Sequence, residues 1–352
     1  MLEMLDKPLT GPKLDWKHGC ITMSHGSGGR AMAQLIEQLF VKAFSNPWLN
    51  AGNDQAIFDA PCGKQMVMTT DSYVISPLFF PGGNIGSLAV YGTINDLAMG
   101  GATPLYLSVG FILEEGFALS DLKTIVYTMS DAAKACNVTI LTGDTKVVER
   151  GKGDGIFINT TGFGVIAQDS CLSGEYARPG DKVLVSGYIG DHGIAILSQR
   201  ESLQFSTNVT SDCAPLHSLV AKMLEVVPQI RCLRDPTRGG LATTLNEWAR
   251  QSEVGFMIDE ATIPVRTAVA SACEILGLDP LYVANEGKLV AVCPTEQADL
   301  LLATMQAHPL GEKSAIIGSV TKDLHQMVQL RTKIGGYRNL DWLTGEQLPR
   351  IC

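Results

Sequence analysis

Four aspartates lie where the sequence predicts that strands or helices end. They are Asp54 in GNDQA, Asp71 in TTDS, Asp96 in INDLA and Asp144 in TGDTK. Several carboxylates at element ends can together hold Mg²⁺, which takes its remaining ligands from water and from substrate phosphate oxygens. Each aspartate alone is more simply a cap or turn residue, because Asn-Asp, Gly-Asp and Thr-Asp are common turn pairs. Taken together, the four favour a site for a metal ion and a nucleotide.

Two glycine-rich segments each precede a predicted helix. The first comprises His25, Gly26, Ser27, Gly28 and Gly29, and the second is DPTRGG, in which Arg238 is available to a phosphate. The free N–H groups and the dipole of a helix N-terminus favour phosphate. The first segment is not a P-loop, because no Gly-Lys-Ser/Thr follows it. A flexible turn explains the first segment almost as well, and a charged helix cap explains the second.

Two further charged residues accompany these motifs. Lys146 follows Asp144 by two positions, so in an extended backbone both side chains project to one side. A lysine there can neutralise a nucleotide phosphate, or it can simply balance Asp144. Glu286 lies in the turn ANEGK. A turn glutamate is usually solvated, but the neighbouring glycine would permit close approach of a ligand.

The last residue is Cys352, in the segment LPRIC. Terminal residues are commonly frayed and without a role. A terminal cysteine is nonetheless a thiol nucleophile on a tether, with the α-carboxylate and Arg350 as its charged neighbours. The chain from Gly335 to the end is long enough to cross a domain face, at up to about 3.3 Å per residue.

Composition limits the class of protein. The 352 residues suit two domains, and 45% hydrophobic with 18% charged residues exclude a disordered chain. A net charge of −9, without any run of Lys and Arg, argues against nucleic-acid binding. Nine cysteines without a CxxC pair argue against a disulfide framework and a zinc site. No signal-peptide pattern and no run of 18 apolar residues occurs, so we expect a cytoplasmic protein that does not cross a membrane.

The elements that position these residues form two mixed α/β (α+β) halves. A polar, turn-rich stretch over residues 168–180 separates them. We therefore predict domains at 19–168 and 169–334, a loosely held extension at 1–18 and a flexible tail at 335–352. Strands are expected at 65–70, 105–113, 138–143, 156–166, 182–187, 288–293, 314–320 and 326–332. Helices are expected from Arg30 to about Phe44, from Asn84 as N-cap to about Met99, from Ser120 as cap, and at 190–200, 215–227, 239–252, 264–276 and 295–307.

These motifs together resemble the HypE family of hydrogenase-maturation carbamoyl dehydratases. The resemblance runs from about residue 20 to 352 and is carried by HGSGG, NDQA, TTDSYV, GGNIG, NDLA, TGDTKVV, PGDKVLVSG, DPTRGG, ANEGK and the terminal PRIC. The more general motifs are similar to a wider superfamily that includes aminoimidazole ribotide synthetase, selenophosphate synthetase and thiamine-phosphate kinase. The terminal PRIC singles out the HypE family. The resemblance implies a two-domain fold like that of aminoimidazole ribotide synthetase, with an ATP site between the domains.

The resemblance also implies an activity. Members of this family are ATP-dependent lyases that dehydrate an S-carboxamide on the terminal cysteine, here Cys352, to an S-cyanide. That group becomes a cyanide ligand of the iron in [NiFe]-hydrogenase. The implied partners are a HypF-type carbamoyltransferase, which loads the cysteine, and a HypC–HypD complex, which carries the iron. A homodimer formed through the first domain is implied as well.

Roles for the candidate residues follow from the resemblance. Asp71, Asp96 and Asp144 would serve Mg²⁺ and ATP, and Asp54 is a further candidate. The segment from His25 to Gly29 would take part in nucleotide binding. Lys146 would contact phosphate and Glu286 would assist proton removal, although these two roles could be exchanged.

Two other classes of function remain open at this point. A selenophosphate synthetase uses an N-terminal cysteine or selenocysteine before a glycine-rich loop with a lysine. Cys20 is present here, but HGSGG contains no lysine. A non-catalytic scaffold that only delivers Cys352 to partners would need no phosphate site, so the aspartates and Lys146 argue against it.

Overall fold

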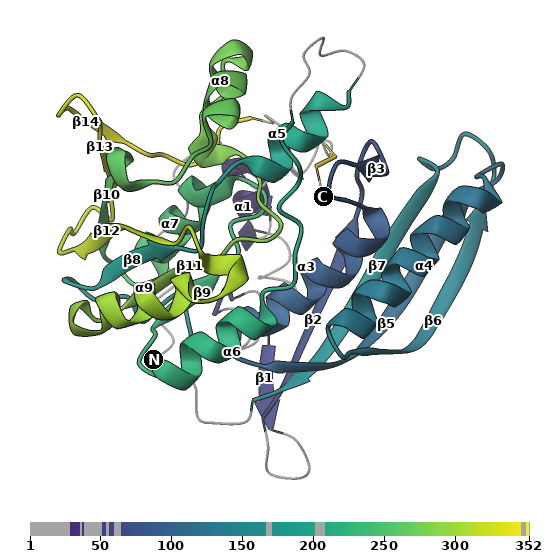
Figure 1. Ribbon diagram of the computed structural model, residues 1–352, viewed down its shortest axis with the longest axis horizontal. Helices are drawn as coiled ribbons and strands as arrows, with labels where there is room; N and C mark the ends of the chain where they lie inside the picture. The colour runs from purple at the N-terminus through teal and green to yellow at the C-terminus, as the bar shows by residue number, and fades with distance from the viewer. Residues whose placement is uncertain are drawn as a thin grey trace.

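The computed structural model describes residues 29–35, 37–38, 51–53, 56–59, 65–166, 171–200, 208–345 and 350–351. Within these residues two β-sheets, each with helices packed on it, organise the chain (Figure 1). The mixed α/β architecture that the sequence predicts is therefore confirmed. No helix among the described residues is long and apolar enough to cross a membrane.

The first sheet has five strands in the order β1-β2-β7-β5-β6. The helices α3 and α4 cover one face of it (Figure 1), while β6 is an edge strand. The bounds of this half are α1 (Arg30–Leu35), β1 (Ala56–Asp59), β2 (Gln65–Tyr73), β3 (Phe79–Phe80), β4 (Gly83–Asn84), α3 (Ile85–Met99), β5 (Thr103–Glu114), α4 (Leu119–Ala135), β6 (Thr139–Val148) and β7 (Ile156–Val165).

The helix α3 is the buried link between the two halves. Asn84 caps it as predicted, since its side chain accepts the N–H groups of Gly86 and Ser87. The Ser87 hydroxyl accepts the N–H of Asn84 in return, which completes a capping box. Every residue of α3 except Tyr91 and Asp96 is buried. The helix packs on β2 and β7 of the first half and on α6 of the second, so its C-terminal turns lie at the junction of the halves.

The second sheet has seven strands in the order β14-β13-β10-β12-β8-β11-β9. Side chains of β8 and β11 alternate between two hydrophobic clusters, one with α7 and one with α6 and α9, so helices cover both faces. The bounds are β8 (Lys182–Val185), α5 (Asp191–Ser198), α6 (His217–Val226), β9 (Cys232–Arg234), α7 (Gly240–Gln251), β10 (Gly255–Asp259), η3 (Glu260–Thr262), α8 (Thr267–Leu276), η4 (Pro280–Tyr282), β11 (Val290–Cys293), η5 (Thr295–Gln297), α9 (Ala298–Gln306), η6 (Pro309–Gly311), β12 (Ala315–Thr321), β13 (Val328–Arg331) and β14 (Tyr337–Asn339).

One hydrophobic cluster joins the two halves. It contains Ile85 and Leu88 of α3 together with Ile194 of α5 and Val269 of α8. Ile351, near the end of the chain, belongs to the same cluster and is 3% exposed. The two halves therefore share a continuous core, and the C-terminal segment contributes to it.

Several sequence predictions need correction. The helix predicted with Ser120 as its cap begins at Leu119, after Ala118, which makes no side-chain capping bond. Asp71 and Asp144 lie inside β2 and β6 and not at strand ends, because neighbouring strands pair with the residues on both sides of them. The tail expected from residue 335 begins inside the β13–β14 hairpin, and Leu340 after it is 1% exposed.

Six of the nine cysteines fall in described residues, and all six are free thiols. Cys136, Cys232, Cys273 and Cys293 are buried. Burial raises the pKa of the Cys273 thiol to about 11 and that of Cys293 to about 12, so these thiols are neutral and inert. These four cysteines are therefore small buried side chains outside any disulfide.

Candidate functional site

Glu286 lies at the centre of a buried group of charges. The residue is 3% exposed, and its Oε1 atom has no hydrogen-bond partner among the described residues. Burial raises the pKa of this carboxyl well above its ordinary value, and the negative charges of Asp235, Asp212 and Asp71 raise it further. The guanidinium of Arg238 opposes them. A carboxyl with a raised pKa, next to several carboxylates, is suited to accept a proton near neutral pH.

The main chain of Glu286 is held from both halves of the molecule. Asn95 is a fully buried residue of α3. Its side-chain amide donates to the main-chain oxygen of Glu286 at 3.2 Å. The N–H of Glu286 donates to Asp212 Oδ1 at 3.1 Å, and Lys288 Nζ lies 3.3 Å from Asp212 Oδ2. The position of Glu286 is therefore set by α3 and by the segment before α6.

The glycine beside Glu286 has a structural reason. A Cβ atom at Gly287 would lie 1.8 Å from the main-chain oxygen of Asp212. The glycine thus allows the turn to pack on its own chain, while its expected role in the close approach of a ligand stays a prediction.

Asp96 of α3 is held on β2, the strand that carries Asp71. Thr69 Oγ1 donates to Asp96 Oδ2 at 2.9 Å. Burial raises the pKa of Tyr73 well above its ordinary value, and the charges of Asp71, Asp96 and Glu286 add to this effect. The charges of three carboxylates, from β2, α3 and the turn before β11, thus act together on the Tyr73 hydroxyl.

Asp144 and Lys146 lie elsewhere. On β6 they are paired in register with Gly110 and Ile112 of β5, and Gly110 is in turn opposite Asn159 of β7. Asn159 donates to the Ser72 hydroxyl at 3.0 Å. Ser72 and Asp71 are successive residues of one strand and point to opposite faces.

Thr160, which is opposite Asp71 in register, donates to the main-chain oxygen of Ala89 in α3, so the helix-covered face carries Asp71 and the uncovered face carries Asp144. Lys146 Nζ lies 3.2 Å from Asp144 Oδ2, and the two side chains are 72% and 68% exposed. The expectation that both project to one side is confirmed. Within one chain, however, this pair is not brought together with Glu286, Asp71 and Asp96.

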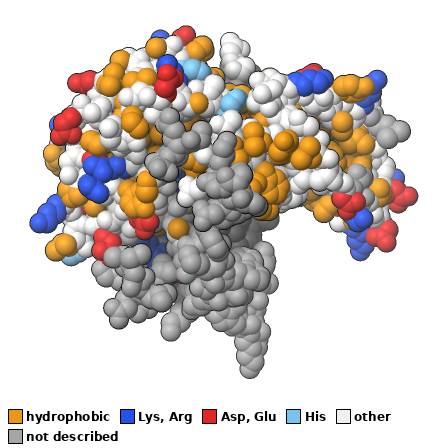
Figure 2. Space-filling model, turned by 90° about the horizontal axis from the view of Figure 1, so that it is seen from below, with side chains coloured by type: hydrophobic (Ala, Val, Ile, Leu, Met, Phe, Trp, Pro, Cys, Tyr) orange, Lys and Arg blue, Asp and Glu red, His pale blue; other side chains and the backbone are white. Residues whose placement is uncertain are grey.

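The uncovered face of the first sheet also carries apolar side chains. Met68, Phe163 and Tyr106 form a row across β2, β7 and β5. Met68 and Tyr106 are 38% and 43% exposed, and Ile112 beside Lys146 is 44% exposed. Figure 2 shows hydrophobic side chains gathered on the lobe that carries this sheet. Exposed apolar groups beside a charged pair are typical of a surface that meets another protein.

The end of the chain docks at the junction of the halves, beside α5 and β3 (Figure 1). Ile351 forms an antiparallel bridge with Ile75, and the N–H of Ser76 donates to the oxygen of Arg350 at 3.2 Å. The Arg350 guanidinium lies 2.7 Å from Asp154. His192 Nε2 is 2.7 Å from the oxygen of Ile351. The residue after Ile351 is Cys352, which lies outside the described residues.

Other predicted site residues also lie outside the part that the structure describes. They are Asp54 and the first four residues of the N-terminal glycine-rich segment, His25, Gly26, Ser27 and Gly28. Gly29 is placed against the C-terminal segment, since a Cβ atom there would be 2.3 Å from the oxygen of Leu343. Arg30 next to it forms an ion pair with Asp341.

The described residues contain no group of three or more His, Cys, Asp or Glu side chains that could hold a metal ion. Mg²⁺ commonly takes only one or two carboxylates and completes its shell with water and phosphate oxygens. Asp71 and Asp96 are consistent with that smaller requirement, because both are only partly buried and the charges of both act on the Tyr73 hydroxyl.

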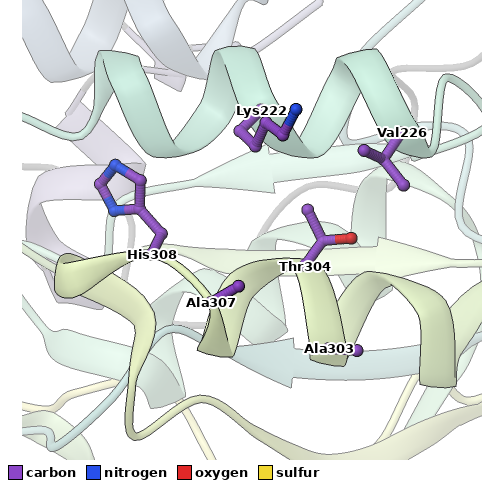
Figure 3. A pocket seen from close by; sticks show the side chains of 6 residues that line it. All are labelled: Lys222, Val226, Ala303, Thr304, Ala307 and His308. Carbon is purple, nitrogen blue, oxygen red and sulfur yellow. The ribbon is translucent and has the colours of Figure 1, made fainter.

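A shallow groove between α6 and α9 lies apart from this site. Figure 3 shows its lining, and none of these six residues is among the candidates above: Lys222, Val226, Ala303, Thr304, Ala307 and His308.

Three residues of the site were not found from the sequence. Asn95 precedes Asp96 in NDLA, Asp212 lies in an ordinary polar segment, and His192 follows the Gly-Asp that opens α5. Their roles arise from contacts between distant segments, so no local pattern marks them.

Two family models match the chain. They are the AIR synthase related protein N-terminal domain, over residues 52–166, and the C-terminal domain, over residues 178–331. The chain is 64% identical to carbamoyl dehydratase HypE of Cupriavidus necator over 96% of its length and 97% of the relative. It is 48% identical to carbamoyl dehydratase HypE of Escherichia coli K12, over 94% of this chain and 99% of that one.

Solved structures resemble the chain along nearly its whole length. A HypE–HypF complex matches with a TM-score of 0.83 and 48% identity, over 88% of this chain and 99% of that chain. A HypE in complex with ATP matches with a TM-score of 0.79 and 51% identity, over 95% and 100%. Thiamine monophosphate kinase of Aquifex aeolicus, at 18% identity and a TM-score of 0.62, shares the fold over 88% and 99%.

Proposed function

This chain belongs to the carbamoyl dehydratase HypE family of AIR synthase related proteins, and on that premise we propose that it uses ATP to convert an S-carboxamide on Cys352 into an S-cyanide during hydrogenase maturation. The observation that carries the proposal is the docked chain end. The Ile351 oxygen bonds to His192, whose other ring nitrogen is 2.8 Å from Ser211, and Asp212 next to Ser211 bonds to the N–H of Glu286. Ile351, the residue before the terminal cysteine, is thus linked through His192, Ser211 and Asp212 to the main chain of the buried Glu286.

The reaction explains why ATP is required. A carboxamide does not lose its oxygen as hydroxide near neutral pH. Its oxygen therefore attacks the γ-phosphorus of ATP, and ADP leaves. The nitrogen then gives up its two protons while the C–O bond breaks and phosphate departs, which leaves S–C≡N. The products are ADP, inorganic phosphate and one further proton, so atoms and charge balance.

Glu286 has the properties of the proton acceptor in this sequence. Its raised pKa keeps it basic enough to take a proton from nitrogen. Burial also keeps water away from the activated intermediate, which water would hydrolyse. Asp71 and Asp96 would hold Mg²⁺, which when bound would neutralise charge on the phosphates. Arg238, beside Glu286, would add positive charge to the same site.

The position of Lys146 leads to a proposal about assembly. Lys146 and Asp144 face away from Glu286 within one chain, on an edge strand beside an exposed apolar row. We propose a homodimer in which the uncovered faces of two first sheets meet. Each chain would then supply Asp144 and Lys146 to the phosphate site of its partner, and burial of Met68, Tyr106 and Ile112 would favour the pairing.

Partners follow from the reaction and from the relatives. The HypE–HypF complex concerns a related protein, and we propose that a HypF-type carbamoyltransferase loads Cys352 of this chain as well. The cyanide would pass to iron carried by a HypC–HypD complex. No membrane attachment is needed for these steps, and a cytoplasmic location fits them.

The test is the mass of the C-terminal peptide after incubation with the carbamoyltransferase, carbamoyl phosphate and ATP. A carbamoyl adduct on Cys352 that then loses one water is expected. If the carbamoyl adduct persists unchanged while ATP is present, the protein does not catalyse the dehydration and only carries the carbamoyl group to partners. Stimulation of ATP turnover by selenide would instead support the selenophosphate synthetase alternative.

A further inference from the structure

The side chain of His192 is fully buried at the N-terminus of α5, and both of its ring nitrogens are engaged. Nδ1 lies 2.8 Å from Ser211 Oγ, and Nε2 lies 2.7 Å from the oxygen of Ile351. A carbonyl oxygen can only accept, so Nε2 carries the proton. In a neutral imidazole Nδ1 must then accept, so the Ser211 hydroxyl donates to it.

The tautomer of His192 is fixed by its surroundings. Burial lowers the pKa of the imidazole and keeps it neutral. Ser211 is itself held in place, because its N–H donates to the oxygen of Pro81 at 2.8 Å and its Oγ accepts the N–H of Cys213 at 3.1 Å. Phe80 meets the imidazole edge to face, with ring centroids 5.6 Å apart. The Nε2–H group is therefore a rigid donor that points at the chain end.

The accepting oxygen belongs to the peptide group that joins Ile351 to Cys352. Because a peptide group is planar, fixing this oxygen also fixes the direction in which the chain leaves Ile351. Ile351 also pairs with Ile75 in an antiparallel bridge, whereas the N–H of Ser76 and the guanidinium of Arg200 bond the oxygen of Arg350, one residue earlier. Among the described residues, His192 is thus the side chain that hydrogen-bonds the last peptide group.

We infer that His192 is a positioning residue for the dehydration step, which seats the C-terminal segment through the Ile351 carbonyl and plays no part in loading the cysteine. This inference rests on the proposed function. Loading requires the chain end to leave the junction and reach another protein, so the bond to His192 is broken in that step. Dehydration requires the reacting group to be held beside Glu286, so the bond is made. The two half-reactions should therefore depend differently on this residue.

The chain offers a matched pair of variants. His192→Gln keeps an N–H donor close to the position of Nε2, whereas His192→Asn keeps a polar group only near the position of Nδ1. In the full-length protein, the carbamoyltransferase should load both variants at the wild-type rate or faster. Single-turnover dehydration of the loaded protein should be slowed by about 10- to 100-fold in His192→Asn, because a small misplacement of reacting groups has an effect of that size. His192→Gln should stay within a few-fold of the wild-type rate.

A second readout is independent of the chemistry. Carboxypeptidase should release the terminal residues faster from His192→Asn than from the wild type, and His192→Gln should resemble the wild type. If His192→Asn does not fold, as judged by its melting transition, Ser211→Ala serves in its place. Ser211→Ala leaves the imidazole intact but frees its tautomer, and an intermediate loss of both dehydration rate and protection is expected.

The outcomes separate this inference from the proposed function. A wild-type protein that forms no S-cyanide would contradict the proposed function. The carboxypeptidase comparison would still test whether His192 holds the C-terminal segment in place. If the wild type is active and the Asn and Gln variants dehydrate and digest at equal rates, His192 does not seat the tail. Slower loading of both variants, without a change in dehydration, would equally overturn the assignment.

Discussion

Asn95 of the first half bonds Glu286 of the second, with 3.2 Å between its side-chain nitrogen and the main-chain oxygen of the glutamate. The same nitrogen donates to the oxygen of Ala214 at 3.1 Å, and the oxygen of the Asn95 amide accepts the N–H of Leu216 at 2.7 Å. One buried amide thus fixes two separate segments of the second half onto α3. The position of the buried carboxyl is tied to the packing of the two halves.

Replacing Asn95 by alanine should therefore destabilise the protein and disturb its site together. Three main-chain groups would lose their partner, and for the two that are buried the cost is about 1–3 kcal/mol each. Urea unfolding should show a loss of at least about 2 kcal/mol in the free energy of unfolding. Thr304→Ala, which removes an exposed hydroxyl that bonds within α9, is the control and should change stability far less. A urea unfolding midpoint of Asn95→Ala equal to that of the wild type would contradict the role of Asn95 in holding the two halves together.

Glu286→Gln should change the pH dependence of stability. The folded-state pKa of Glu286 is raised above its ordinary value of 4.5. The favourable contribution of Glu286 to the free energy of unfolding is therefore fully present below about pH 4.5. It is lost as the pH rises toward the folded-state pKa. In that window the unfolded state has released a proton that the folded state keeps, and wild-type stability falls by up to about 1.4 kcal/mol per pH unit from this group.

Glutamine does not titrate, so Glu286→Gln should match the wild type in acid and become more stable than it as pH rises. Chemical unfolding at a series of pH values measures the difference. The variant should lose dehydration activity while it gains stability. A constant difference between the two proteins across the pH range would mean that the pKa of Glu286 is not raised in the folded state.

Most elements could be predicted from the sequence because their hydrophobic patterns are long and their caps are local. Asn84 at the start of α3 is such a case, as the capping box involves residues only three apart. The sequence analysis does not predict β9 or β10. β9 has only three residues, too few to show an alternating pattern, and β10 has five and follows directly on the helix and turn before it. Hydrophobic periodicity cannot identify strands that are this short.

The residue types of the site could be predicted from the sequence, but not which of these residues the fold brings together. Sequence motifs indicated Asp71, Asp144 and Lys146 together, yet which face of a sheet each occupies depends on strand register. His192 and Ile351 are 159 residues apart, and Asn95 and Glu286 are 191 apart. Contacts of that kind are products of the tertiary fold and leave no local signal.

Mixing two inactive variants should restore activity if each site draws on two chains. Lys146→Ala and Glu286→Gln should each abolish dehydration alone. Lys146 is 72% exposed in an ion pair at the surface, so its loss should leave the fold intact. In a mixed dimer, one site combines the intact Glu286 of one chain with the intact Lys146 of the other.

Random mixing of equal amounts should then give about a quarter of wild-type activity, since half of the dimers are mixed and each has one complete site. The control is a mixture of Lys146→Ala with the double variant Lys146→Ala/Glu286→Gln, which should stay inactive. Absence of any recovery, in a sample shown to contain mixed dimers, would place Lys146 and Glu286 of one chain in the same site or remove Lys146 from the reaction.

The most direct prediction concerns the last residue. Ile351 is 3% exposed and belongs to the shared core, so the chain is buried at the residue before Cys352. Cys352→Ser should fold normally and still bind ATP, yet acquire no carbamoyl or cyano adduct. Cys171→Ser is the matched control, because Cys171 is an exposed free thiol and its loss should leave the adduct unchanged.

Other thiols near the site should not substitute for Cys352. Burial, together with the charges of Glu286 and Asp212, raises the pKa of Cys213 well above its ordinary value, which keeps that thiol protonated and unreactive. Two or three residues appended after Cys352 should be nearly as damaging as its replacement, because a longer end has to be buried beyond Ile351 while every catalytic group is retained. The mass of each cysteine-containing peptide after the full reaction decides the question. An S-cyanide on Cys171 or Cys213, or full dehydration in the extended protein, would rule out a site that accepts only the end of the chain.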